Sequence, residues 1–198
     1  MTGGFDVRLR SLLVCKVAIW PADWARLAEE LGQARGRGAD RADFAEAFLQ
    51  AILFYGFPRA VSAFEILQRD WPVDTAPSGG SLPREDQARA GRELFDSIYG
   101  KNHAAVHALL RSFHAEFHDF VLEAAYGRIL TRPGLVPRER ELLATAALAV
   151  MRQIPQLLAH SRGALRFGAT EAELREALRI GGIDGAEARA LILRIQGV

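Results

Sequence analysis

Two polar residues whose side chains could move a proton stand on neighbouring helical stretches of this chain. Glu141 lies about three turns before a short turn around Arg152–Pro155, and His160 lies about one turn after it. Helices joined by so short a turn are usually antiparallel neighbours, so both side chains could face a common groove. A carboxylate beside an imidazole holds its tautomer and favours its protonated form, as proton transfer requires. A solvated glutamate and a structural histidine on an interhelical surface are the alternative interpretation.

Four more histidines are spaced so that a single helix would carry them on one side. His103, His107, His114 and His118 would fall within an arc of about 60° on the shoulder of the apolar face. Each i, i+4 pair could chelate a metal ion, but on a continuous helix the two pairs would lie about 16 Å apart. One ion could not reach both pairs. We therefore interpret these residues as amphipathic boundary positions and predict no metal site, since a metal ion would need further ligands from elsewhere in the chain. Metal-dependent chemistry on this helix stays a third hypothesis, and one or two of the histidines could instead line a pocket beside the glutamate–histidine pair.

A loop arginine precedes the helix that carries Glu141. Arg132 stands in the sequence Arg-Pro-Gly-Leu, and an arginine before a helix N-terminus could bind an anionic carboxylate. It could equally cap the helix ahead of it. The residues alone leave both roles open.

Composition and charge limit the class of protein. The 198 residues suffice for one large domain or two small ones, and 25 basic against 24 acidic side chains argue against a nucleic-acid-binding protein. The segment 156–180 is similar to a helix-turn-helix, but its second helix would open with Glu-Ala-Glu, which repels phosphates. No signal-peptide core follows the N-terminus, and no apolar run approaches the ~20 residues of a membrane span. We therefore expect a cytoplasmic protein that binds neither nucleic acid nor membrane.

The single cysteine excludes disulfide chemistry within the chain. Cys15 has no second cysteine with which to form a bridge or a Cys-x-x-Cys redox pair. It lies in the apolar run 12–15, so we expect a buried, unreactive thiol.

Helical periodicity runs through nearly the whole chain, and clear period-two strand patterns are missing. The predicted fold class is therefore all-α. Asn102 could cap one helix, and Thr170 with Glu173 has the spacing of a capping box. Helices are expected at about 7–19, 22–35, 40–55, 59–69, 84–98, 102–126, 137–152, 155–166, from 170 onward, and at 185–196.

Prolines and glycines concentrate between residues 70 and 83, which makes this segment the best linker candidate. We therefore divide the chain into an N-terminal part at 1–70, a linker at 71–83 and a C-terminal part at 84–198. The two parts match each other at one constant offset in sequence number, which indicates an internal tandem repeat. Ser11 and Glu30 stand where the second copy has Glu141 and His160, so at most one copy keeps that pair. Identical residues pair as Arg8/Arg138, Arg10/Arg140, Leu12/Leu142, Leu13/Leu143, Leu27/Leu157, Gly38/Gly168 and Glu46/Glu176.

The second copy resembles the carboxymuconolactone decarboxylase family, part of the AhpD-like superfamily. The resemblance covers about 84–180 and extends through the repeat to 8–67. It implies a helical fold that assembles as trimers or hexamers around an interface site, so a trimer of two-copy chains would imitate a hexamer. The residues that carry it are Tyr126 to Leu135, Arg138 to Leu143, Gln156 to His160, Gly163 to Leu165 and Gly168 to Leu178.

The resemblance also implies an activity and roles for particular residues. The decarboxylase branch, which belongs to aromatic degradation, removes CO2 from a carboxylated lactone without an external cofactor. His160 would be the general acid/base, Glu141 would orient it, and Arg132 would help to hold a substrate carboxylate. Tyr126 and His118 are further candidates for substrate binding.

Two other interpretations of the same scaffold differ in chemistry. The peroxidase branch uses a Cys-x-x-Cys pair, but Gln153 and Gln156 occupy those positions here, so thiol peroxidase activity is not expected. Tyr126 and Leu130 stand where the decarboxylases usually have Trp, which puts the substrate in question. The second hypothesis is a non-catalytic small-molecule-binding or stress-response protein that keeps the fold.

Overall fold

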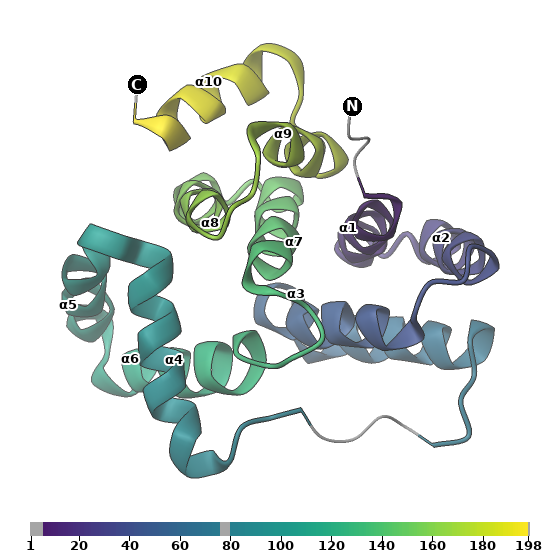
Figure 1. Cartoon of the computed structure of the whole chain (residues 1–198), viewed down its shortest axis with the longest axis horizontal. Coiled ribbons are helices and arrows are strands. Elements are labelled where there is room, and N and C mark those ends of the chain that lie inside the picture. Colours follow the sequence, from purple (N-terminus) through teal and green to yellow (C-terminus); the bar gives the residue numbers. More distant parts are fainter. Residues whose placement is uncertain (1–5, 76–79, 198) are drawn as a thin grey trace.

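Two helices, α1 and α7, pack together at the centre of the larger group of helices, and α4, α5 and α6 lie to one side of it (Figure 1). The structure is a computed structural model that describes residues 6–75 and 80–197. Within these ranges every regular element is helical, which confirms the all-α fold class. The elements are α1 (Val7–Ile19), α2 (Trp24–Gly36), α3 (Arg41–Asp70), α4 (Arg84–Tyr99), a 3₁₀ turn η1 (Gly100–Asn102), α5 (His103–Phe113), α6 (Ala115–Phe120), a π-helix η2 (Val121–Leu130), α7 (Pro137–Val150), α8 (Ile154–Arg166), α9 (Glu171–Ile180) and α10 (Gly185–Gln196).

Side-chain caps explain where four of these helices begin. The carboxylates of Asp6, Asp23 and Asp40 accept hydrogen bonds from backbone N–H groups in the first turns of α1, α2 and α3. Thr170 and Glu173 form the capping box that the sequence predicted for α9. Each cap satisfies N–H groups that would otherwise lack a partner, and each is supplied by residues next to the helix itself.

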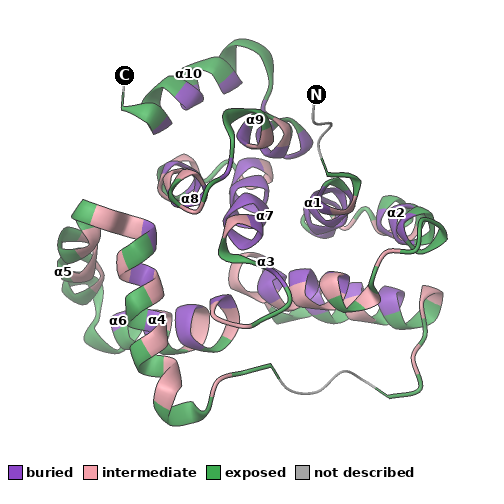
Figure 2. Ribbon diagram, in the orientation of Figure 1, coloured by how far each residue is buried: buried purple, intermediate pink, exposed green. Residues whose placement is uncertain are grey.

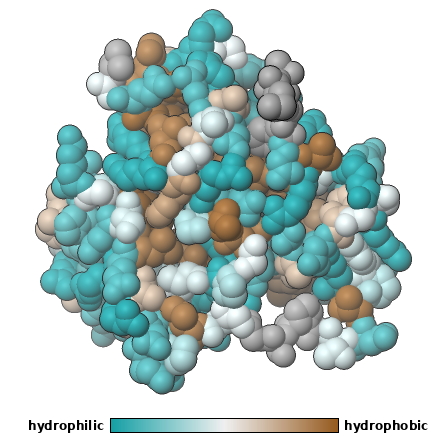
Figure 3. All heavy atoms as spheres, viewed as in Figure 1, coloured by the Kyte–Doolittle hydropathy of each residue, from teal (hydrophilic) through white to brown (hydrophobic). Residues whose placement is uncertain are grey.

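The central helices are buried on nearly all sides (Figure 2). Every residue from Ser11 to Ile19 of α1 is buried, as is every residue from Glu139 to Ala149 of α7. Such all-round burial is typical of a helix in the middle of a core. The face in Figure 3 is mostly hydrophilic, with hydrophobic residues visible between polar ones. Cys15 is fully buried, as the sequence predicted, and burial raises the pKa of its thiol, which is consistent with an unreactive cysteine.

Helices from both sides of the predicted linker share this core. α1 packs directly on α7, and α2, α3, α8 and α9 cover the two. The predicted linker is irregular at 71–75 and 80–83, and its residues 76–79 lie outside the described residues. The N-terminal and C-terminal parts therefore form one continuous hydrophobic core.

α3 is one long element where the sequence predicted two helices. The expected break is present as a kink at Gly56 (φ 73°, ψ 174°), which is followed by Pro58. By length and composition alone α3 could cross a membrane, because it contains a stretch of mean hydropathy 1.3. The expectation that no apolar run approaches that length is therefore wrong for α3. Of that stretch, 39% is buried against the rest of the fold.

The predicted continuous helix at 102–126 is wrong, because the chain turns at His114. The backbone there is extended (φ −169°, ψ 131°), so α5 ends at Phe113 and α6 starts afresh. The turn lets α6 pack against α5 and η2, while α5 and η2 in turn pack on α4. Close approach of α4 and η2 requires Gly91, since a Cβ there would lie 2.4 Å from the carbonyl oxygen of Leu122. The smaller core formed in this way contains Phe95, Ile98, Leu122, Tyr126 and Leu130.

Candidate active site

Glu141 and His160 meet where α7 and α8 pack together. The Nδ1 atom of His160 lies 3.0 Å from Oε2 of Glu141. The glutamate side chain is 2% exposed and the histidine side chain 12%, so the pair is largely shielded from water. When the carboxylate accepts a hydrogen bond from Nδ1–H of the neutral ring, the other ring nitrogen, Nε2, keeps its lone pair for a reacting group. The structure thus brings together the two residues that the sequence singled out for proton transfer.

A glycine on α8 leaves room for the Glu141 carboxylate. A Cβ at Gly163 would lie 2.4 Å from Glu141 Oε2 and 3.1 Å from Cγ2 of Ile98. The backbone of Glu141 is fixed as well, because the Thr145 hydroxyl donates to its carbonyl oxygen over 2.9 Å. The carboxylate therefore occupies a space that any larger residue at position 163 would fill.

Two tyrosines from the smaller core, Tyr99 and Tyr126, lie close enough to Glu141 for its charge to affect their pKa values. The Tyr126 hydroxyl donates to the Tyr99 hydroxyl over 3.4 Å. Burial raises the pKa of both phenols, and the nearby Glu141 carboxylate raises them further. Both rings pack on Phe95, with ring centres 4.4 and 4.9 Å away. Tyr126, a predicted substrate-binding residue, thus lies near the pair, although its hydroxyl is buried and bonded to Tyr99.

Lys16 is a polar residue of this region that sequence reasoning missed. Its ammonium nitrogen lies 4.8 Å from the centre of the Phe54 ring, which in turn meets the His160 ring edge-on at 6.2 Å. Lys16 is fully buried, and within the described residues its Nζ atom has no hydrogen-bond partner. Burial lowers the pKa of its amine well below the usual range, and the positive charge of Arg140 adds to this, while Glu141 opposes it. A lysine in the otherwise apolar run 12–19 was the available sequence signal.

Arg132 lies in an ion cluster with Glu46 of α3. Its Nε and Nη2 atoms donate to the Glu46 carboxylate over 2.7 to 3.0 Å, and its Nη1 donates to Ser81 over 2.7 Å. The buried Arg140 donates to the same carboxylate over 2.9 Å. Burial alone would raise the pKa of Glu46, but the hydrogen bonds from both arginines lower it overall. A substrate carboxylate would have to compete with Glu46 for Arg132, so its role in substrate binding stays a prediction.

His118 belongs to a different cluster from Glu141 and His160. Its side chain is fully buried, with Nε2 2.8 Å from Nδ1 of His107 and Nδ1 2.8 Å from the Asp119 carboxylate. The expected wide separation of the two histidine pairs is therefore wrong, because the turn at His114 folds α6 back onto α5. Phe95 lies between the two regions and also packs on the His107 ring at 4.5 Å.

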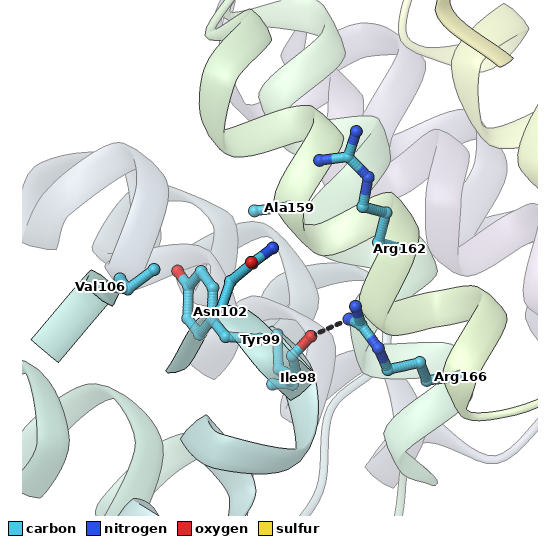
Figure 4. Close-up of a pocket in the computed structure, with 7 residues that line it drawn as sticks. All are labelled: Ile98, Tyr99, Asn102, Val106, Ala159, Arg162 and Arg166. Carbon is cyan, nitrogen blue, oxygen red and sulfur yellow. Dashed lines mark hydrogen bonds between the residues drawn. The ribbon is translucent and has the colours of Figure 1, made fainter. Parts of the chain in front are cut away.

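A small hollow lies between α4, α5 and α8, and Ala159, the residue before His160, is part of its wall (Figure 4). Its volume of ≈170 Å³ is below the roughly 300–1,000 Å³ of most ligand pockets. Arg166 points its guanidinium at the Ile98 carbonyl oxygen and donates to it. As it stands in one chain, the hollow would admit only a small molecule. It is lined by Ile98, Tyr99, Asn102, Val106, Ala159, Arg162 and Arg166.

Residues 115–193, which include Glu141, His160 and Gly163, match the model of the carboxymuconolactone decarboxylase family. The chain is 29% identical over 141 residues to Peroxisomal protein 2 of Schizosaccharomyces pombe, and the match covers 68% of this chain and 65% of that protein. It is 29% identical over 93 residues to the 4-carboxymuconolactone decarboxylase of Acinetobacter baylyi, covering 46% of this chain and 69% of that enzyme. It is 37% identical over 60 residues to the nitrosuccinic acid decarboxylase of Metarhizium robertsii, covering 30% of this chain and 42% of that enzyme.

These similarities support the carboxymuconolactone decarboxylase family, and the all-helical architecture is consistent with its fold. The chain spans slightly less than two thirds of the first of these relatives. Two of the three are decarboxylases by name, which supports a decarboxylase-like family.

Proposed function

We propose that the protein is a cofactor-free decarboxylase of a small carboxylated molecule, such as a carboxylated lactone. The observation that carries the proposal is the shielded hydrogen bond between Glu141 and His160 inside the segment that matches the family. Loss of CO2 breaks a C–C bond and leaves its electron pair on the neighbouring carbon. That carbanion must then receive a proton, and the imidazole Nε2 is the group available to deliver it.

Each member of the pair has a distinct role in this proposal. Protonated His160 gives its Nε2 proton to the carbanion and later recovers one from water. Glu141 accepts a hydrogen bond from Nδ1–H, so it fixes which nitrogen faces the substrate and stabilises the charged ring before the first transfer and after the second. Arg132 would bind the substrate carboxylate after releasing Glu46, and Tyr126 would line the apolar side. Low water access favours the reaction because CO2 is neutral and its carboxylate precursor is charged.

The proposal extends to an ancestry in two copies, related by the offset that places Arg8 on Arg138. Two features of the fold support it. At this offset the first residues of α1 and α2 fall on the first residues of α7 and α8, and Ala22 (φ 60°) falls on Arg152 (φ 59°), which shares its rare left-handed backbone. The ion pairs are also reciprocal. Arg10 contacts Glu176, and at the equivalent positions Arg140 contacts Glu46.

In the first copy, Ser11, Glu30 and Arg37 hydrogen-bond to one another at the place where the second copy has Glu141 and His160. The Ser11 hydroxyl donates to the Glu30 carboxylate over 2.7 Å, and Arg37 donates to both. No imidazole stands there, so the proposed chemistry belongs to the second copy alone.

We further propose that the chain works as a homo-oligomer, a trimer or hexamer. Leu109, Phe113, Phe117 and Phe120 of α5 and α6 expose between 47% and 68% of their surface, which is unusual for a row of large apolar side chains. A neighbouring copy on this row would cover it. The same contact would enlarge the walls of the small hollow beside α5.

Release of CO2 from 4-carboxymuconolactone by the purified chain tests the proposal. We expect turnover by the wild type and a loss of about 10²–10⁴-fold in His160→Gln, since that is the usual contribution of a general acid/base. Glu30→Gln changes the equivalent position of the first copy without altering its shape, and we expect full activity from this control. Undiminished turnover in His160→Gln would refute the mechanism.

The second candidate function is binding without catalysis. The observation that favours it is the bidentate grip of Arg132 on Glu46, which leaves a substrate carboxylate in competition with a residue of the same chain. A thermal-shift series with small carboxylated lactones separates the two functions. Stabilisation without CO2 release supports the binding protein, whereas stabilisation with CO2 release supports the enzyme.

A further inference from the structure

Three potential metal ligands converge outside the candidate active site, on the far side of Phe95. Oδ1 of Asp96 on α4 lies 3.0 Å from Nδ1 of His103 and 2.8 Å from Nε2 of His107, both on α5. All three donor atoms lie within 4.8 Å of one another. The two histidines are one helical turn apart, so their rings project from the same side of α5.

We propose that Asp96, His103 and His107 bind one divalent transition-metal ion of the zinc type. Two imidazoles with one carboxylate are a ligand set that such ions take up, and three protein ligands leave a further position for water or substrate. With metal–ligand bonds of about 2.0–2.2 Å, neighbouring ligand atoms around one ion lie roughly 3–3.5 Å apart. The observed spacings of 2.8 and 3.0 Å therefore need only small adjustments to admit an ion.

The neighbouring polar groups are arranged so that a cation can join them at this position. Asp96, His107, His118 and Asp119 form a row with three close contacts of 2.8 Å each. Two neutral imidazoles supply two of the three protons that such a row of hydrogen bonds needs. The third place, between Asp96 and His107, can be taken by a further proton or by a metal ion, and the binding experiment below separates the two. His107 Nδ1–H then donates to His118, and His118 Nδ1–H donates to Asp119, as metal-binding histidines commonly do.

The rings that would bind the ion are already held in place. Phe95, itself fully buried, packs against His107 at 4.5 Å, and the buried His118 fixes the far nitrogen of the same ring. His103 and Asp96 are 44% and 37% exposed, so the ion could enter from solvent. Arg92 and Arg111 line the hollow in front of the ligands. Their positive charges oppose a bare cation and favour an anionic group, such as a carboxylate, on the open position.

The proposal is independent of the decarboxylase chemistry and is tested by binding alone. The full chain is stripped of metal with a chelator and titrated with Zn²⁺ by calorimetry, and Co²⁺ is then added as a coloured probe of the ligand geometry. We expect one ion per chain and visible Co²⁺ absorption bands of a low-coordinate N/O site. Asp96→Asn and His103→Gln should each weaken binding by at least about 10-fold, because each removes a direct ligand.

His114→Gln is the matched control, since His114 is an exposed histidine of the same segment that lies outside the cluster. It should bind as the wild type does. Both test variants change partly exposed side chains, and a thermal melt verifies that they remain folded. Equal affinity in His103→Gln, Asp96→Asn and wild type, or no binding by the wild type at 100 µM Zn²⁺ (about −5.5 kcal/mol), would overturn the proposal.

Discussion

The Glu141 carboxylate fits into the candidate active site only because residue 163 is a glycine without a Cβ atom. Gly163→Ala is therefore the most informative substitution. The new methyl carbon would lie 2.4 Å from Glu141 Oε2, whereas ordinary contacts begin at roughly 3.4 Å. The carboxylate must then retreat by about 1 Å, and a retreat directed away from His160 stretches its 3.0 Å contact to about 4 Å, beyond hydrogen-bond range. Because Ile98 closes the space from another side, the methyl group cannot easily shift instead.

We expect Gly163→Ala to remain folded and to lose activity. A misplacement of about 1 Å in a catalytic group costs on the order of 10²-fold in turnover. Overpacking costs about 1–3 kcal/mol, and the better helix propensity of alanine offsets roughly 0.5–1 kcal/mol of it. CO2 release gives the first quantity and urea unfolding gives the second. Nitrogen-15 NMR of the His160 ring reports its tautomer without any substrate, and the variant should lose the fixed Nδ1–H form.

Gly32→Ala is the matched control for this substitution. Gly32 lies on the exposed face of α2 with an ordinary backbone, and nothing lies within 4 Å of the place that the new methyl group would take. It should leave turnover unchanged and stabilise the chain by about 0.5–1 kcal/mol. If Gly163→Ala kept both the His160 tautomer and full turnover, the hydrogen bond to Glu141 would not be what organises the site.

Three further predictions concern the core and the surface. Burial lowers the pKa of Lys16 in the folded chain below the ordinary 10.5 of the unfolded chain. At any pH between the lowered pKa and 10.5 the unfolded chain therefore binds one more proton than the folded chain. The free energy of unfolding of the wild type then falls by about 1.4 kcal/mol per pH unit as the pH falls through that range. Lys16→Met should remove this slope, and urea unfolding from pH 7 to 10 would contradict the burial argument if the two slopes were equal. Gly91→Ala should destabilise the chain by about 1–3 kcal/mol, because its methyl group meets the backbone oxygen of Leu122, and an unchanged melting temperature would show that α4 and η2 can separate at little cost. Phe113→Ser with Phe117→Ser should reduce the molecular mass in light scattering to that of one chain, whereas an unchanged oligomer would place the interface elsewhere.

Helix positions could be predicted closely because the signals that set them are local. Asp6, Asp23 and Thr170 cap their own helices, and predicted and observed starts agree within about two residues there. The turn at His114 could not be found in this way. The segment has no proline or glycine at that point, and the break goes with the packing of α6 on α5 and η2, which depends on the tertiary fold and not on local sequence.

The difference between local signals and tertiary packing also decides which residues of each site could be predicted from the sequence. Glu141 and His160 could be singled out because a short turn places their helices side by side, which allows both side chains to face one groove, although only the fold gives their distance. Asp96 lies seven residues before His103 on a separate helix, and only the angle between α4 and α5 brings its carboxylate to the histidine rings. The partner of Arg132 is still more remote, since Glu46 is 86 residues away. A metal ligand or an ion pair that depends on helix packing therefore leaves no spacing signal, and only the folded chain reveals it.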